Sequence, residues 1–115
     1  MAFSPDFTEA NFRKELQATF DQVEAAFEQV DPDLVECDQA FGSLTLRTAD
    51  GARVILSAQP SVRQLWLALA AKGTAHHFDY DHAGKRWMDD KGKGIELLTF
   101  LKAHFLDVAG VRLSF

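Results

Sequence analysis

The stretch at residues 64–70, QLWLALA, alternates leucine with other residues along its length. Successive side chains of a β-strand point to opposite faces of the sheet, so Leu65, Leu67 and Leu69 share one face. Trp66 then lies on the other face. Antiparallel sheets commonly bury one face and leave the other in water, and this stretch is typical of such a strand. We therefore predict that the leucines face a hydrophobic core and that Trp66 stands on the open face.

Turn residues interrupt the chain at similar intervals on both sides of this strand. They are 9, 9, 13 and 11 residues apart, at Gly42, Gly51, Pro60, Gly73 and Gly84. This rhythm predicts an antiparallel meander of short strands. The expected strands are 35–40, 43–48, 53–57, 64–70, 76–80 and a short one around Trp87.

Helical periodicity flanks the meander on both sides. In the first thirty residues, apolar side chains spaced 4, 4, 3, 4 and 3 apart predict one amphipathic helix, namely Phe12, Leu16, Phe20, Val23, Phe27 and Val30. Either residues 4–6 or Thr8 with Glu9 would start this helix, and Pro32 would stop it. A last helix is expected from about residue 95 to 108, with Gly110 closing it. Its expected inward residues are Leu97, Leu98, Leu101 and Phe105, and the apolar tail 111–115 is expected to pack.

The order helix, meander, helix predicts an α+β fold. We expect a two-layer α-β sandwich, with the N- and C-terminal helices on one face of the antiparallel sheet. The length of 115 residues suits a single domain, residues 1–115.

The composition narrows the class of protein. Apolar residues make up 47% and charged residues 25%, which is ordinary for a soluble globular domain. We expect neither a membrane span nor a secretory signal, because no apolar run of about 20 residues and no basic, then apolar, start occurs. The single cysteine, Cys37, excludes an internal disulfide and a multi-cysteine zinc site, and it favours the bacterial cytoplasm.

Charge is distributed unevenly along the chain. Residues 1–38 carry ten acids against two bases, a net −8, whereas residues 39–115 carry seven acids against ten bases, a net +3. Between residues 15 and 38 there are eight acids and no base. Nucleic acid would be repelled by this half, since phosphate binding needs a basic footprint. The charge favours a cation or a basic protein as the partner.

The acids also follow a geometric pattern. At 100° per residue, four of them flank the apolar stripe of the first helix, namely Asp21, Glu24, Glu28 and Asp31. After a turn through Asp33, strand alternation puts Glu36 and Asp38 on one face. If strand and helix lie side by side, these carboxylates form one row. A solvated helix face is the alternative, but such faces usually mix both signs of charge. Carboxylate oxygens suit hard cations (iron, manganese, magnesium or calcium), so we expect several weak sites.

The open sheet face is the second candidate surface. An exposed tryptophan on a flat sheet suits an interface anchor, although Trp66 could equally be covered by a neighbour and only pack. If Phe78 points inward, His77 and Asp79 join Trp66 on the open face. The alternation of residues 76–82, HHFDYDH, splits its histidines and aspartates between two faces, so a metal site there is not expected. Cys37 is expected to face the core, and no nucleophile motif or phosphate loop occurs.

Taken together, these motifs resemble the frataxin family, in its bacterial CyaY type. The resemblance runs in unbroken order over about residues 12–115. It rests on the acidic first helix and on VECD (35–38), GSLTL (42–46), QP (59–60), QLWLA (64–68), HFD (77–79), GKRW (84–87) and AG (109–110).

The resemblance implies an iron-binding adaptor that regulates iron–sulfur cluster assembly and has no active site of its own. Iron, ferrous or ferric, would bind weakly at an acidic ridge, which we define as Asp21, Glu24, Glu28, Asp31, Asp33, Glu36 and Asp38. The partners would be the cysteine desulfurase and the iron–sulfur scaffold complex, contacted by Gln64, Trp66, His77 and Asp79. Neither nucleic acid nor a membrane is expected as a partner. The chain would be a monomer, or an oligomer when iron is bound.

Two alternatives belong to other classes. One is a ferroxidase that oxidises ferrous iron at paired carboxylates and stores it as the chain assembles. The other is a protein-interaction module for which metal is incidental.

Overall fold

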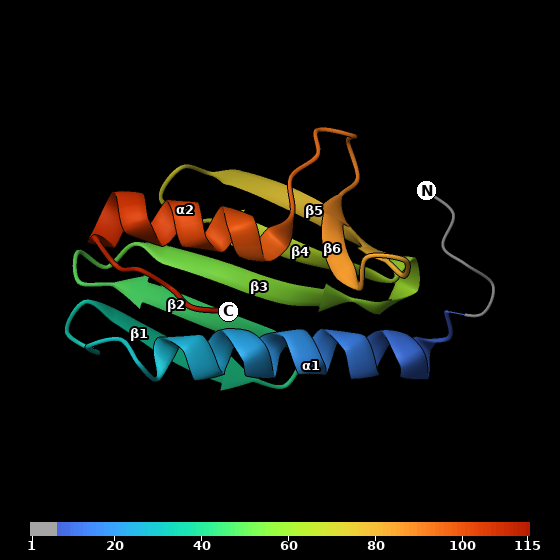
Figure 1. Cartoon of the computed structure of the whole chain (residues 1–115), viewed down its shortest axis with the longest axis horizontal. Coiled ribbons are helices and arrows are strands. Elements are labelled where there is room, and N and C mark those ends of the chain that lie inside the picture. The colour runs from blue at the N-terminus through green and yellow to red at the C-terminus, as the bar shows by residue number, and fades with distance from the viewer. Residues whose placement is uncertain (1–6) are drawn as a thin grey trace.

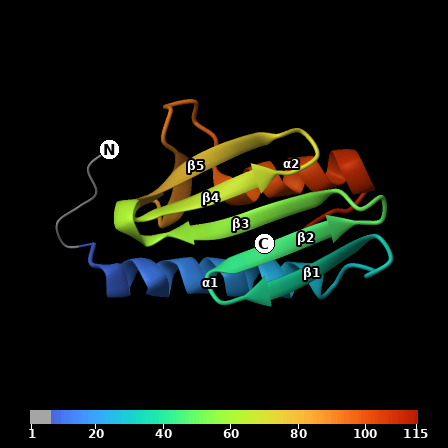
Figure 2. The same ribbon diagram turned by 180° about the vertical axis from the view of Figure 1, so that it is seen from behind.

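The computed structural model describes residues 7–115 and has two layers. Helices α1 (Glu9–Phe27) and α2 (Leu97–Ala109) cover one face of a six-stranded antiparallel sheet (Figure 1). No helix of residues 7–115 covers the other face, which Figure 2 shows toward the viewer. Each strand pairs with its neighbours in sequence, in the order β1 (Val35–Ala40), β2 (Ser43–Thr48), β3 (Arg53–Gln59), β4 (Gln64–Leu69), β5 (Thr74–Asp81) and β6 (Arg86–Asp89). The predicted α+β sandwich is confirmed.

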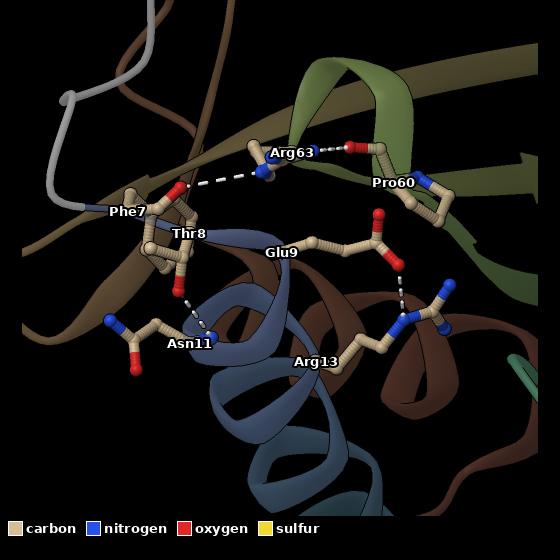
Figure 3. Close-up of polar contacts among 7 residues, drawn as sticks. All are labelled: Phe7, Thr8, Glu9, Asn11, Arg13, Pro60 and Arg63. Atoms are coloured by element: carbon tan, nitrogen blue, oxygen red, sulfur yellow. Dashed lines mark hydrogen bonds and ion pairs between the residues drawn. The ribbon is translucent and has the colours of Figure 1, made fainter.

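Helix α1 begins where Thr8 caps it. The Thr8 hydroxyl accepts a hydrogen bond from the backbone N–H of Asn11 at 3.1 Å (Figure 3). The predicted start at Thr8 and Glu9 is confirmed, while the alternative at residues 4–6 lies outside the described residues. The helix ends at Phe27, earlier than expected, and Val30 is half-buried in the turn that precedes Pro32. The short 3₁₀ helix η1 (Pro60–Val62) is tied to the same region, because the Arg63 guanidinium donates to the carbonyls of Phe7 and Pro60.

Strand pairing extends two strands beyond their predicted ends. Gln59 pairs with Gln64 across η1, so β3 is longer than the alternating run at 53–57 suggests. Thr74 pairs with Leu69, so β5 begins before His76 while β4 ends at Leu69. Backbone hydrogen bonds to a neighbouring strand hold these positions, and they leave no apolar signal in the sequence.

The core lies between the helices and the sheet. Leu65, Leu67 and Leu69 are buried there as predicted, in one core with the apolar stripe of α1. On α2, Leu97, Leu101 and Phe105 are also buried. Leu98 is only half-buried, contrary to prediction, because it lies about 100° around the helix from Leu97.

The C-terminal segment closes the core between the two helices. Gly110 ends α2 at φ +66°, a conformation that favours glycine. The chain then runs back between α1 and α2 (Figure 1), and Val111 and Leu113 are both 6% exposed. The expected packing of the tail is confirmed. Neither described helix is long and apolar enough to cross a membrane.

Candidate functional site

An acidic groove lies where α1 runs beside the edge strand β1 (Figure 1). Glu24 and Glu28 line it from the helix, and Glu36 and Asp38 line it from the strand. The hollow measures about 460 Å³, and the rest of its wall comes from Phe27, Val30, Pro32, Val35 and Cys37. The structure thus brings together four members of the acidic ridge that are as far apart as fourteen residues in sequence.

The other three members of the acidic ridge lie outside this groove. Asp21 is exposed and accepts a hydrogen bond from Gln17 Nε2 at 2.8 Å, and the same amide donates to Gln39 Oε1 of β1. Asp31 and Asp33 form the turn between helix and strand, where the Asp33 N–H donates to Asp31 Oδ1 at 2.9 Å. Their carboxylates are exposed, so they extend the negative surface rather than close a cage.

A basic residue beside the acidic groove was missed by sequence reasoning. Arg47 of β2 pairs directly across the hairpin with Glu36, and its guanidinium Nη1 lies 3.6 Å from Glu36 Oε2. The helix and β1 hold no base between residues 15 and 38, but the neighbouring strand supplies one. The hairpin register around Gly42 is the signal that would have found it. Both side chains are substantially exposed, and such pairs contribute about 0.2–1 kcal/mol.

Cys37 forms part of the groove wall and packs against the core. Burial, followed by the charges of Glu24, Asp38 and Glu28, raises the pKa of the Cys37 thiol to about 11. The thiol is therefore protonated at neutral pH and is a poor metal ligand and nucleophile. Its expected position toward the core is confirmed, although the side chain is half-buried rather than enclosed.

The groove suits a loosely held hard cation. Within residues 7–115, no group of three or more His, Cys, Asp or Glu side chains converges to hold a metal ion. The donors present are carboxylate oxygens on an open surface, which fit ferrous iron, manganese or calcium with water in the remaining positions. The side chains of residues 76–82, HHFDYDH, likewise do not converge as a group of three.

The open sheet face holds a second cluster, which we call the tryptophan platform: Gln64, Trp66, His77, Asp79 and Asp90. Trp66 pairs with His77 across β4 and β5, and their rings stack at 4.2 Å between centroids with 14° between planes. Trp66 is half-buried, so its neighbour covers part of the ring and the rest faces solvent. The predicted placement of Trp66, His77 and Asp79 on the face opposite the leucines is confirmed.

The buried side-chain amide of Gln64 connects Trp66, Asp79 and Asp90 of the tryptophan platform by hydrogen bonds. Only 5% of Gln64 is exposed, whereas the sequence suggested a partner contact on the surface. Its Oε1 accepts from Trp66 Nε1 at 2.9 Å, and its Nε2 donates to Asp79 Oδ1 and Asp90 Oδ2, each at 3.1 Å. Alternation gives the face on which a side chain lies but not its depth, so burial of Gln64 could not be predicted.

Asp90 is a further residue that the sequence analysis missed. It follows β6, where strand alternation has ended, and its backbone N–H donates to the carbonyl of His77 at 2.9 Å. Its carboxylate Oδ2 lies 3.7 Å from His77 Nδ1, so protonation of His77 would create an ion pair there. Gln64 and Asp90 together fix the rings of the tryptophan platform.

The frataxin-like domain family matches residues 5–111 of the chain. The chain belongs to the frataxin family. Relatives of this family named "Iron-sulfur cluster assembly protein CyaY" are 38% identical in Pseudomonas fluorescens Pf-5 and 40% in Azotobacter vinelandii DJ. Each of these alignments spans 108 residues and 94% of both chains.

Solved frataxins share the fold. The frataxin of Psychromonas ingrahamii matches with a TM-score of 0.83 and 27% identity, over 93% of this chain and 96% of that one. The trimeric frataxin of Saccharomyces cerevisiae, solved in complex with ferrous iron, matches with a TM-score of 0.66 over 96% and 94% of the two chains. Its identity is 21%, so it bears on the frataxin fold alone.

The second tryptophan of this frataxin-family chain belongs to the core. Trp87 is 2% exposed, and its Nε1 donates to Thr19 Oγ1 of α1 at 2.8 Å. Its ring meets Phe12 edge-on at 6.0 Å between centroids. Of the two tryptophans, only Trp66 can therefore contact a partner.

Proposed function

We propose that this frataxin-family protein is an iron-binding adaptor that regulates iron–sulfur cluster assembly in the bacterial cytoplasm. It docks on the cysteine desulfurase and its scaffold complex. The observation that carries the proposal is the acidic groove, which carboxylates from the α1 side and from β1 line together with a protonated thiol. The names of the CyaY relatives, which align along nearly their whole length, support the same pathway.

Iron is the cargo of the groove rather than a resident cofactor. Glu24, Glu28, Glu36 and Asp38 supply hard oxygen donors, and exposed carboxylates leave several positions of the ion to water. Such binding is weak and reversible, which suits an adaptor that has to give up what it carries. Asp21, Asp31 and Asp33 extend the field that attracts the cation.

Docking uses two different surfaces. The acidic ridge at the β1 edge faces a basic patch of the desulfurase, which speeds encounter and fixes orientation. The tryptophan platform, on the sheet face away from the helices (Figure 2), supplies a rigid aromatic anchor. The acidic ridge contributes mainly charge and the tryptophan platform mainly apolar contact. The salt dependence of binding should therefore distinguish the two contributions.

The experiment is a titration of the host desulfurase complex at two salt concentrations. Wild-type binding should weaken with salt, and neutralising Glu24 and Glu28 to Gln should reduce that salt dependence. Trp66→Ala should weaken binding at both concentrations and leave the salt dependence unchanged. Absence of wild-type binding at low salt would refute the docking proposal.

An oxygen measurement separates the adaptor from a ferroxidase. Oxygen consumption with ferrous iron should show no saturable turnover above the rate without protein. Saturable turnover that is lost in the Glu24→Gln, Glu28→Gln variant would favour the enzyme instead.

A further inference from the structure

Phe41 stands at the tip of the β1–β2 hairpin with 96% of its surface exposed. The other large exposed apolar side chains in the described part of the chain lie between 41% and 47%. Single exposed apolar residues are common on protein surfaces, but a phenylalanine that is almost entirely in water is unusual. Its position therefore needs a reason.

The hairpin itself gives no reason for a phenylalanine. Ala40 pairs with Ser43, so Phe41 and Gly42 form the whole connection. Gly42 supplies the left-handed conformation that the turn requires, at φ +75°. Phe41, the other residue of the connection, does not adopt a positive φ, and such a turn position accepts most residue types. The Phe41 ring adds nothing to the turn and nothing to the core.

The surroundings of Phe41 connect it to the acidic ridge. Two residues earlier, Gln39 accepts a hydrogen bond from Gln17, which also holds Asp21 on α1. Asp38, which lines the acidic groove, directly precedes Gln39 in strand β1. The hairpin tip thus lies at the end of the acidic ridge, with carboxylates of helix and strand behind it.

One face of the Phe41 ring already lies near a guanidinium. The Arg13 guanidinium carbon lies 5.9 Å from the ring centroid, within the range of a cation–π contact. Arg13 is held in turn by Glu9, whose carboxylate lies 3.0 Å from its Nε (Figure 3). The ring is exposed enough to take a second cation or an apolar wall from outside the molecule.

We propose that Phe41 is a hydrophobic anchor through which the chain docks on a basic protein. The ring enters an apolar pocket bordered by arginine or lysine, and the acidic ridge pairs with the basic rim. Charge complementarity selects this occupant, because the acidic ridge beside the anchor attracts a basic surface and repels the same ridge of another copy. The inference rests on the proposed function, since it adds an anchor to the surface that faces the desulfurase complex.

The test compares three variants in the desulfurase titration at fixed salt. Phe41→Ser should weaken binding about tenfold while the melting temperature stays unchanged, because an anchoring aromatic contributes strongly and its removal leaves no cavity. Phe41→Trp should retain the affinity. Val108→Ser, at a 47% exposed residue on α2, is the matched control and should bind as the wild type does.

Two outcomes would contradict the proposal that Phe41 is an anchor, and both would leave the proposed function intact. One is Phe41→Ser that binds as tightly as the wild type while Trp66→Ala binds weakly. The other is a change in the mass of the free protein in sedimentation on Phe41→Ser, which would assign the ring to contacts between copies. A wild type that does not bind the complex would refute the proposed function itself.

Discussion

Trp66 and Trp87 occupy opposite environments on neighbouring parts of one sheet. Trp66 is half-buried against His77 on the open face, and Trp87 is enclosed between the sheet and α1. The same substitution therefore tests two different things. At one position it probes a surface, and at the other it probes the core.

Replacing each tryptophan by alanine should separate binding from folding. Trp66→Ala leaves no core cavity and should cost well under the ~3–5 kcal/mol of a buried tryptophan, yet weaken binding to the desulfurase by well over tenfold. Trp87→Ala removes core contacts and the hydrogen bond to Thr19, so it should lower stability by about 3–5 kcal/mol. Melting temperature and affinity per folded molecule are the measurements. Unfolding by Trp66→Ala with unchanged affinity would show that the platform is only structural.

Cys37 should react unusually slowly with alkylating reagents. With its pKa raised to about 11, the thiolate at pH 8 is on the order of a hundredfold rarer than for an ordinary cysteine. Neutralising Glu24 and Glu28 to Gln removes two charges that raise this pKa, so the pKa should fall and alkylation should speed up. Iodoacetamide modification followed by mass spectrometry gives both rates. Equal rates in the two proteins would contradict the electrostatic part of the argument.

At the scale of elements, α1 and β1 hold like charges close together, which lowers the stability of the folded chain. Carboxylates in the acidic groove repel one another more in the folded chain than in the expanded one. Only Glu36 has a basic partner close by, Arg47, among the four groove acids that the structure describes. The cost therefore falls mainly on Glu24, Glu28 and Asp38.

A triple variant of these three acids tests that cost. Glu24→Gln, Glu28→Gln and Asp38→Asn together should raise the melting temperature without metal, while the Glu36–Arg47 pair remains. Ferrous iron or manganese should raise the melting temperature of the wild type. At a hundredfold excess of metal over Kd, binding to the folded state adds about 2.7 kcal/mol to the free energy of unfolding. The variant should lose this response. A triple variant less stable than the wild type, or equally responsive to metal, would contradict the argument.

Elements with a buried face were the most predictable part of the molecule. Alternation at QLWLALA and the stripe from Phe12 to Phe27 follow from burial on one side, and the structure has both. Strand ends at Gln59 and Thr74 escaped prediction because backbone pairing sets them. Arg47 and Asp90 escaped for a related reason, since each reaches its site through contacts between neighbouring strands.

At the scale of the whole molecule, the sheet carries the two proposed docking surfaces on one rigid frame. The acidic ridge lies along the β1 edge, and the tryptophan platform lies on the open face of β4 and β5. Helices occupy only the opposite face (Figure 1), so a partner can approach both surfaces without moving either helix. The core determines how the two surfaces are spaced.

Strand β1 is an edge strand, and within the described chain no further strand pairs with its outer side. Such an edge can recruit a strand from another molecule, and charged side chains along it are a common protection against aggregation. Glu36 and Asp38 are charged side chains of this kind, and they also line the acidic groove.

Saturating iron would neutralise these two carboxylates and leave the edge of β1 without repelling charge, so light scattering should rise with iron and fall again on chelation. Phe41→Lys, at the end of the same strand, should suppress that rise; scattering indifferent to iron would contradict the argument. The carboxylates that we propose to bind iron would then also be what keeps neighbouring molecules apart in the absence of iron.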